Sequence, residues 1–406
     1  MSRVFVDYLG ERMGALADAS GSIFFEYDPA FLATGHELSP LALPLSRGVL
    51  SRDTPPSARL PGVFEDSLPD QWGTTLMTEW FRARGTPEHE VTPLMRLSYV
   101  GRRSIGALAY SPEEEVTAPS GPLSVDELYR AASQAEEGGE IDLGALATVA
   151  TSAGGARPKA LVAFPHGARK RALPGAGPLP EGHEAWILKF DTTMRNDVAP
   201  IEEAYARMAR AAGIDMPETS LVETAADGRT RRHFAVRRFD RQGATRLHFH
   251  SLAGLLNAGP SDCDYATLLR ATRRVTKDER EVWRAFRRAA FNVLAENRDD
   301  HAKNHGFLYR DRTWTLAPAF DLTFGAQIAD RGMALVGERR AAGPVHLLRL
   351  AETEALDRKT ALRVIEEVRS AIAGWRGFAE EAGVPSGRAA EIDLALRARH
   401  LSPALR

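Results

Sequence analysis

Cysteine is almost absent from this chain of 406 residues, which has Cys263 alone. A single cysteine excludes a disulfide framework within the chain and any zinc site built from several cysteines, and it is typical of a reducing compartment. A run of about 18 apolar residues is also missing, and the first residues lack the apolar core of a signal peptide. These absences predict a soluble, cytoplasmic protein with no membrane partner.

An excess of positive charge is missing too. Lys and Arg number 52 against 54 Asp and Glu, so the composition does not predict broad electrostatic binding to nucleic acid. The hydrophobic fraction of 44% and the charged fraction of 26% are ordinary for globular proteins and argue against disorder. The chain is too long for one ordinary core, so we expect two or three packed units.

The sequence also lacks the Gly-x-Ser-x-Gly elbow of many hydrolases and the Walker A sequence of many nucleotide-binding proteins. Cys263 stands between Asp262 and Asp264, whose negative charges disfavour a nucleophilic thiolate. The sequence therefore does not support a hydrolase that acts through a serine or cysteine nucleophile.

The segment from Asn297 to Asn304, followed by Pro318 to Leu322, is the most informative part of the chain. Asp299, Asn304 five positions later and Asp321 beyond a predicted hairpin repeat the order of the catalytic residues in protein kinases. The first Asp orients and deprotonates a hydroxyl, and the other two residues supply oxygen ligands for Mg²⁺. Alone, an Asp-rich turn is more often a cap and turn, so the upstream sequence has to support this interpretation.

A small segment precedes a predicted strand that begins at Lys159. It contains Gly154, Gly155 and Ala156, with Arg157 close behind. Glycine lets backbone N–H groups approach phosphate oxygens, and the two cations offset the charge of a triphosphate. By itself the pattern is more typical of a turn before a strand, and it is not the regular glycine pattern of protein kinases.

Lys189 lies between apolar neighbours in a second predicted strand, and Glu202 and Glu203 begin the next predicted helix. Burial of an unpaired lysine is costly, although alternate positions of a strand often face solvent. In protein kinases a strand lysine binds the phosphates and a helix glutamate holds it. We expect Lys189 to bind phosphate, and either glutamate to be its partner.

The run from Arg237 to Arg241 would by default be a charged turn. Placed between two lobes, the backbone at Arg237 and Phe239 would meet adenine, and Asp240 would meet a ribose hydroxyl. His301 and His305 have a spacing that suits zinc on a helix. The sequence around His305 instead indicates a loop that enters a strand, so a zinc hydrolase is the weaker interpretation.

The order of predicted elements is a β-rich region, a second region with strands and helices, and a mainly helical region from about residue 247. The predicted strands are Val4–Leu9, Ser22–Tyr27, Ile105–Tyr110, Lys159–Phe164, Trp186–Phe190, Ser220–Glu223 and His233–Arg237. The predicted helices are Gln71–Arg84, Met95–Val100, Ser124–Ala135, Ile201–Ala212 and Lys277–Glu296. Prolines and glycines predict a loop from Pro165 to His183.

Together these residues resemble the HipA family, the serine/threonine kinase toxins of type II toxin-antitoxin modules. The motifs that carry the resemblance are Val6–Gly14, Phe64–Gly73, Ser152–Lys159, Trp186–Phe190, Arg238–Arg241, Asn297–Asn304 and Ala317–Thr323. The resemblance implies an α+β, bilobal protein-kinase-like fold related to phosphatidylinositol 3/4-kinases. Residues 1–115 would be the N-terminal subdomain, 116–240 the kinase N-lobe with the phosphate-binding loop, and 241–406 the helical C-lobe.

The resemblance further implies ATP and Mg²⁺ as cofactors. Asp299 would be the catalytic base, and Asn304 and Asp321 would hold the metal. His301 and Lys303 would lie beside the nucleotide, together with the phosphate-binding residues already named. Ser152 would be the autophosphorylated serine whose modification inactivates the kinase.

The partner implied is a small helix-turn-helix antitoxin, similar to HipB, which would bring the chain to DNA. The implied substrate is a protein, with an aminoacyl-tRNA synthetase as the expected target, and its phosphorylation would arrest growth. Two departures from the family pattern, Phe324 and the Arg157-Pro158-Lys159 sequence, remove no catalytic group. A catalytically silent co-repressor that keeps the kinase shape is the alternative.

Overall fold

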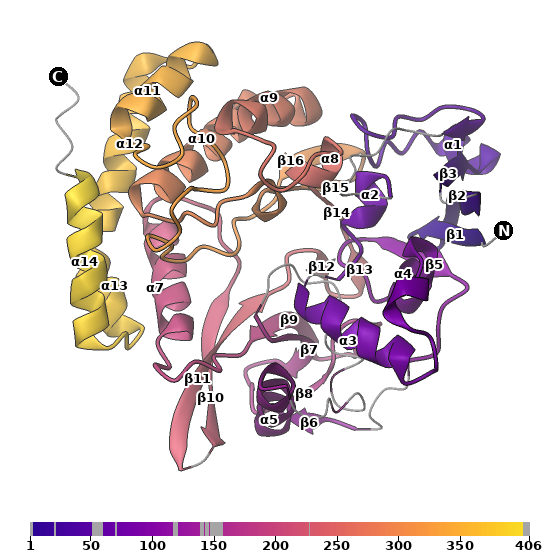
Figure 1. The fold of residues 1–406 in the computed structure, drawn as a ribbon. Coiled ribbons are helices and arrows are strands. Elements are labelled where there is room, and N and C mark those ends of the chain that lie inside the picture. The colour runs from indigo at the N-terminus through magenta and orange to yellow at the C-terminus, as the bar shows by residue number, and fades with distance from the viewer. Residues whose placement is uncertain are drawn as a thin grey trace.

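The computed structural model describes residues 3–19, 22–50, 60–69, 71–116, 121–138, 142, 146, 157–226 and 228–400. The first part forms a five-stranded antiparallel sheet in the order β4-β3-β2-β1-β5 (Figure 1). Its strands are β1 (Arg3–Tyr8), β2 (Glu11–Ala19), β3 (Ser22–Tyr27), β4 (Val49–Leu50) and β5 (Leu108–Ser111). Leu9 and Gly10 join β1 to β2 with φ values of 50° and 90°, a turn whose twist matches that of the paired strands.

Short helices accompany this sheet and lead toward the second one. They are α1 (Pro29–Thr34), α2 (Gly62–Glu65), α3 (Gln71–Arg82), the 3₁₀ turn η1 (Glu88–Glu90) and α4 (Pro93–Val100). The helices predicted from residues 71 and 95 are thus confirmed. The predicted strand from Ile105 begins only at Leu108, because Gly106 adopts a φ of 78° and donates its N–H to Asp240 Oδ2 at 2.8 Å.

The second sheet has six antiparallel strands in the order β10-β11-β9-β7-β8-β6. The strands are β6 (Leu123–Ser124), β7 (Lys159–Pro165), β8 (Arg171–Pro174), β9 (His183–Lys189), β10 (Thr219–Ala226) and β11 (Arg229–Arg237). The four longer strands confirm the predicted ones. The loop predicted from Pro165 to His183 is wrong at β8, a short strand whose proline ends its pairing with β7.

Helices cover both faces of this sheet (Figure 1). On one face, α3 and α5 (Val125–Glu136) pack Trp72 and Leu128 in one buried cluster with Val162 and Trp186. On the other face, α7 (Val198–Ala211) packs against Phe234. The predicted helix from Ser124 is confirmed as α5, and a capping box begins it, with the side chains of Ser124 and Glu127 bonded to each other's backbone N–H groups.

The last part combines helices with a three-stranded sheet, β14-β15-β16. Its elements are β12 (Arg241–Gln242), β13 (Thr245–Arg246), β14 (His248–Ser251), α8 (Leu252–Leu255), α9 (Tyr265–Thr276), α10 (Glu279–Leu294), η2 (Ala302–Asn304), β15 (Gly306–Arg310), β16 (Thr313–Leu316), α11 (Pro344–Thr353), α12 (Arg358–Ala373), α13 (Trp375–Glu381) and α14 (Ser386–His400). The predicted helix Lys277–Glu296 is confirmed as α10. The strand predicted after His305 and the hairpin predicted before Asp321 are confirmed as β15 and β16. Strand β14 is short and partly polar, so its pattern does not predict a strand.

The described part of the chain contains no helix that is both long and apolar enough to cross a membrane. Cys263 is buried and unpaired, and burial raises the pKa of its thiol to about 11, with Asp262 and Asp264 adding to the rise. This environment agrees with the expectation that Cys263 is not a nucleophile.

Candidate active site

A cavity of about 550 Å³ lies where the second sheet, the loop before β15 and the segment after α2 meet. Strands β9 and β11 supply an apolar wall from Ile187, Phe234 and Val236. The loop before β15 supplies the polar residues Asp299, His301, Lys303 and Asn304, and Asp321 and Leu322 close the same side. The size and mixed lining are those of a small-molecule site.

Lys189 ends β9 and reaches two carboxylates in this cavity. Its Nζ donates to Asp321 Oδ1 at 2.5 Å and also to Glu202, and its side chain is 12% exposed. Burial alone would lower the pKa of Lys189, but Asp321 and Glu202 outweigh it and hold the pKa above its ordinary value. Glu203 instead accepts from Arg207 Nε at 2.7 Å. Of the two glutamates that the sequence leaves open, Glu202 is the partner of Lys189.

Asp299 lies at the start of the loop that leads to β15, and its side chain is 54% exposed. Its Oδ1 lies 3.7 Å from His301 Nε2. The amide of Asn304 donates to the backbone carbonyl of Asp299 at 2.8 Å. This bond closes the loop, and it leaves the Asp299 carboxylate accessible from the cavity.

Asp321 adopts a φ of 57°, a left-handed backbone that is uncommon for a residue other than glycine. Burial raises its pKa, but Lys189, and more weakly Lys159 and Arg157, lower it to about 2. Asp321 and Asn304 line the same cavity and offer the oxygen ligands that Mg²⁺ prefers. The donor types of these two residues therefore fit a magnesium ion, which Asn304 and Asp321 would hold.

Arg157 and Lys159 lead into and begin β7, next to the Lys189 strand. Lys159 pairs with Lys189 in the sheet register, and Arg157 Nη1 lies 3.7 Å from Glu202 Oε2. Both cations act on Asp321, as its pKa shows. The predicted phosphate-loop residues Gly154, Gly155 and Ala156 and the predicted modification site Ser152 lie outside the described residues.

The run from Arg237 to Arg241 also reaches the cavity, but its side chains differ in their roles. Arg237 Nη2 lies 3.2 Å from Glu184. Phe239 packs against Phe249 and Phe320, with ring centroids 5.8 and 5.6 Å away. These three rings form an aromatic end of the cavity.

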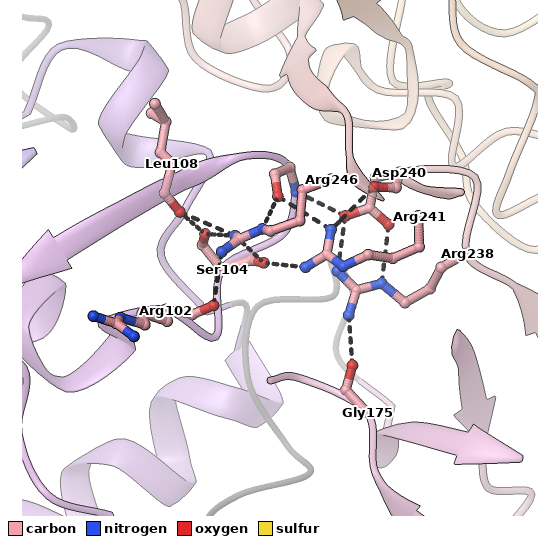
Figure 2. A network of polar contacts seen from close by, with 9 residues as sticks. Arg102, Ser104, Leu108, Gly175, Arg238, Asp240, Arg241 and Arg246 are labelled. Atoms are coloured by element: carbon pink, nitrogen blue, oxygen red, sulfur yellow. Dashed lines mark hydrogen bonds and ion pairs between the residues drawn. The ribbon is translucent and has the colours of Figure 1, made fainter. Parts of the chain in front are cut away.

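Asp240 is the centre of a buried network of arginines (Figure 2). Its carboxylate accepts from Arg238 Nε at 2.9 Å and Nη2 at 2.7 Å, from Arg241 Nη1 and from the N–H of Gly106. Burial raises the pKa of Asp240, and the two arginines more than reverse this and hold it below its ordinary value. Both carboxylate oxygens of Asp240 already have protein partners. We therefore assign Asp240 to this network and do not propose a ribose contact for it.

His305 differs from the zinc ligand of the weaker interpretation. It is buried, and its ring lies edge-on to Tyr265 at 5.9 Å. Burial lowers the pKa of His305, and Arg288 and His301 lower it further. The positive charge of Arg288 opposes a divalent cation there, and no cluster of three or more His, Cys, Asp or Glu suited to a metal occurs among the described residues.

Sequence reasoning missed the part of the cavity wall that comes from the N-terminal region. Glu65, Asp66, Leu68, Pro69 and Gln71 line the cavity opposite residues that follow more than a hundred positions later. Asp66 accepts from His250 Nδ1 and the N–H of Ser251, each at 2.7 Å. The only signal in the sequence is the Phe64–Gly73 motif, whose spacing points to no chemistry of its own.

Known proteins are similar to this chain over its length. Residues 4–111 match the HipA N-terminal domain, and residues 151–375 match the HipA-like C-terminal domain. A Sinorhizobium fredii protein named "Putative kinase Y4dM" is 30% identical over 150 residues, 34% of this chain and 37% of that relative. "Putative kinase Y4mE" of the same organism is 28% identical over 397 residues, 90% of this chain and 82% of that relative.

A solved structure has the same fold at low sequence identity. It is the complex of Shewanella oneidensis MR-1 HipA with HipB and operator DNA, with a TM-score of 0.73 and 16% identity, over 98% of this chain and 96% of that one. The similarity covers both the N-terminal sheet and the part that holds the cavity. With the HipA-like C-terminal domain alone matching more than half of its residues, the chain belongs to the HipA family.

Proposed function

We propose that this protein is an ATP-dependent serine/threonine protein kinase. The observation that carries the proposal is the convergence of Lys189, Glu202, Asp299, Asn304 and Asp321 on one cavity. This is the set of residue types that phosphoryl transfer requires, in the chain order of a protein kinase. Two relatives bear names that describe them as kinases, which agrees with the proposal.

Each residue has a role in the proposed reaction. The apolar wall of Ile187, Phe234 and Val236 suits an adenine ring, and Lys189 would bind the phosphates. Asn304 and Asp321 would hold Mg²⁺, which when bound offsets charge on the transferred phosphoryl group. Asp299 is the most exposed of the cavity carboxylates for which we propose a role, and it would orient and deprotonate the substrate hydroxyl.

The arrangement around the cavity supports a bilobal kinase in which the six-stranded sheet is the N-lobe and residues 241–406 are the C-lobe. The strand and helix that carry Lys189 and Glu202 would correspond to the lysine strand and glutamate helix of protein kinases. The relation to phosphatidylinositol 3/4-kinases is part of the same proposal. Residues 1–115 would be an added subdomain that closes one wall.

We also propose that the protein is the toxin of a toxin-antitoxin pair. The solved HipA relative binds HipB and operator DNA, so the partner would be a small helix-turn-helix protein that brings this chain to DNA. Its substrate would be a protein, with an aminoacyl-tRNA synthetase as the candidate. Ser152 would be the site of autophosphorylation, and a phosphate there would compete with ATP for Arg157 and Lys159.

The kinase proposal is tested with purified protein, labelled ATP and Mg²⁺. Asp299→Asn keeps the metal ligands and removes the base, so phosphotransfer should fall by about 10²- to 10⁴-fold while nucleotide binding persists. The matched control is Asp311→Asn, because the side chain of Asp311 is 88% exposed and does not line the cavity. Equal phosphotransfer by the Asp299 variant would refute the role of Asp299. Nucleotide binding without phosphotransfer by the unaltered protein would favour the silent co-repressor.

A further inference from the structure

Residues 325–340, named here the docked segment, follow Asp321 and lie against the catalytic loop, residues 297–304. The N–H of Gly325 donates to the carbonyl of Glu296 at 2.9 Å, and the N–H of Gly332 donates to the carbonyl of Arg298 at 3.0 Å. In many protein kinases the segment in this place becomes ordered only when a phosphorylated side chain contacts an arginine.

Arg298 precedes the proposed base Asp299, and protein groups already occupy its guanidinium. Nε donates to Glu296 Oε2 at 2.7 Å, and Nη1 donates to the carbonyls of Ile328 and Ala329 at 2.9 and 3.0 Å. The side chains of Arg298 and Glu296 are 12% and 3% exposed. Arg298 thus binds the docked segment directly, without a phosphate between them.

A buried ion pair makes the second connection. Arg331 Nη1 donates to Asp300 Oδ2 at 2.8 Å, and both side chains are fully buried. The hydroxyl of Tyr265 donates to the same Asp300 oxygen, and the N–H of Met333 donates to Oδ1 at 3.4 Å. Asp300 is the immediate neighbour of Asp299, so the ion pair fixes the backbone of the loop next to the proposed base.

The contact between the two segments is too close for a side chain at Gly332. A Cβ atom there would lie 2.4 Å from the N atom of His301. The neighbouring side chains Met333 and Leu335 are fully buried in the core. The docked segment is therefore packed into the molecule as well as hydrogen-bonded to the loop.

The sequence of the docked segment gives an independent observation. From Phe324 to Glu352 the chain contains no serine, threonine or tyrosine. No hydroxyl is therefore present in the docked segment to receive an activating phosphate.

We propose that Asp300 and Arg331 are positioning residues that hold Asp299 by docking residues 325–340 permanently on the catalytic loop, so that phosphotransfer requires no phosphorylation of this segment. The proposal rests on the kinase function proposed above. The mechanism predicts a loss in turnover rather than in ATP binding, because Lys189 and Asp321 are not part of the pair.

Asp300→Asn, Arg331→Met and Arg331→Lys test the pair. Asp300→Asn keeps the shape and should lower kcat by about 100-fold, the effect of a misplacement on the order of 1 Å, with KM for ATP within about twofold. Arg331→Lys should recover part of the kcat that Arg331→Met loses. The control is Asp330→Asn, which breaks the solvent-exposed Asp330–Arg340 pair of the same segment and should leave kcat unchanged.

Hydrogen exchange is the second measurement, and it tests the docking even if a variant folds poorly or the unaltered protein shows no phosphotransfer. Hydrogen exchange should be slow in residues 297–304 and 325–340 of the unaltered protein, and Asp300→Asn should speed it in both stretches together. Folded Asp300→Asn with kcat within about threefold of the unaltered value, or unchanged exchange in both stretches, would overturn the proposal. Absence of phosphotransfer in the unaltered protein would instead refute the kinase function, and the exchange result would still decide the docking.

Discussion

Lys189 is the residue on which the charge balance of the cavity depends. Without it, Glu202 and Asp321 would face each other as two carboxylates with little access to water, an arrangement that raises the pKa of one of them. The lysine is paired with both carboxylates before any nucleotide arrives. The proposed phosphate-binding group is therefore already oriented, and a metal at Asp321 would have to compete with an ammonium group.

The pH dependence of stability should report this pairing. The pKa of Asp321 falls from an ordinary 3.8 to about 2 in the folded protein, which corresponds to about 2 kcal/mol. A lowered carboxylate pKa stabilises the fold above the unfolded value, and this contribution is lost as the pH falls from about 4 to about 2. Asp321→Asn should thus be less stable at pH 7, and its difference from the unaltered protein should vanish near pH 2.

Urea unfolding at a series of pH values measures this difference. Asp311→Asn is the matched control, since its side chain is 88% exposed. A stability difference for Asp321→Asn that stays constant from pH 6 to pH 2 would show that Lys189 does not hold Asp321 as described.

The residue types and spacing of the sequence were enough to find Lys189, Asp299, Asn304 and Asp321, but not Glu65 and Asp66, which line the same cavity. Asp299, Asn304 and Asp321 lie within one loop and the hairpin after it, so their order along the chain carries the information. Asp240 lines the cavity, but the sequence does not show that its carboxylate is bonded to two arginines and to the N–H of Gly106, which is far away in the sequence. The sequence also does not predict the Asp300–Arg331 pair, because an aspartate and an arginine can form either a buried or a surface ion pair.

At the scale of elements, β13 and the turn before β5 are held together by one side chain (Figure 2). Arg246 donates from Nε to the carbonyl of Gly106 at 2.9 Å, from Nη1 to that of Arg102 at 3.0 Å and from Nη2 to that of Leu108 at 3.0 Å. It also reaches the hydroxyl of Ser104 at 2.8 Å. Burial lowers the pKa of Arg246 to about 10, and Arg238 contributes to the fall.

Arg246→Lys should therefore be strongly destabilising even though it keeps the charge. A lysine ammonium cannot reproduce the planar set of donors, so buried carbonyls would lose their partners at about 1–3 kcal/mol each. Thermal unfolding should show a lower Tm. Arg102→Lys is the control and should leave Tm unchanged. The Arg102 side chain is 78% exposed, and its Nε lies 3.9 Å from Glu113 Oε2, which is too far for a hydrogen bond.

A substitution at the end of α9 should stabilise the protein instead of destabilising it. Lys277 caps this helix with a φ of 55°, and its N–H donates to the carbonyl of Arg273 at 3.0 Å. Glycine adopts this backbone without strain, so Lys277→Gly should stabilise the protein by about 0.5–1 kcal/mol. Lys359→Gly, inside the first turn of α12, should destabilise it by a similar amount in the same unfolding experiment. A loss of stability in both variants would contradict the assignment of the cap.

The elements that the sequence predicted well are those with long apolar patterns or explicit end signals, such as α10 and the capped α5. The strands β8 and β14, which the sequence did not predict, have four residues each, too few for alternation to be recognised against flanking turns. β5 begins later than predicted because a contact from Asp240 fixes the backbone at Gly106. Such tertiary contacts override a local β preference.

At the scale of the whole molecule, the N-terminal region joins the rest through backbone contact between α2 and α8. A Cβ on Gly62 would lie 2.1 Å from the carbonyl oxygen of Gly254, and a Cβ on Gly254 would lie 2.4 Å from Asp66 Oδ2. The N–H of Gly62 donates to Asn257 Oδ1 at 2.7 Å. The next residues along the chain, from Glu65 onward, form the cavity wall.

Gly62→Ala should therefore weaken the whole assembly and the active site together. The added methyl group meets backbone atoms that cannot rotate away, and overpacking of this kind costs about 1–3 kcal/mol. Tm and the affinity for ATP should both fall. Gly377→Ala is the control, because a Cβ there has nothing within 4 Å and the residue lies in α13, where alanine should be neutral or stabilising. An unchanged ATP affinity in Gly62→Ala would show that the N-terminal wall does not matter for the nucleotide.

The residues that line the cavity are far apart in the sequence, so the cavity can be completed only late during synthesis. Gln71 lies in the N-terminal part of the lining, and Leu322 is its last residue in the sequence. At about 5–20 residues per second, a ribosome needs roughly 10–50 s to pass from one to the other. A nascent chain that has folded its N-terminal sheet still lacks residues 297–304 and Asp321, one of the two proposed metal ligands. Translation itself thus delays the completion of the cavity, and no truncated product that stops before residue 322 contains its whole lining.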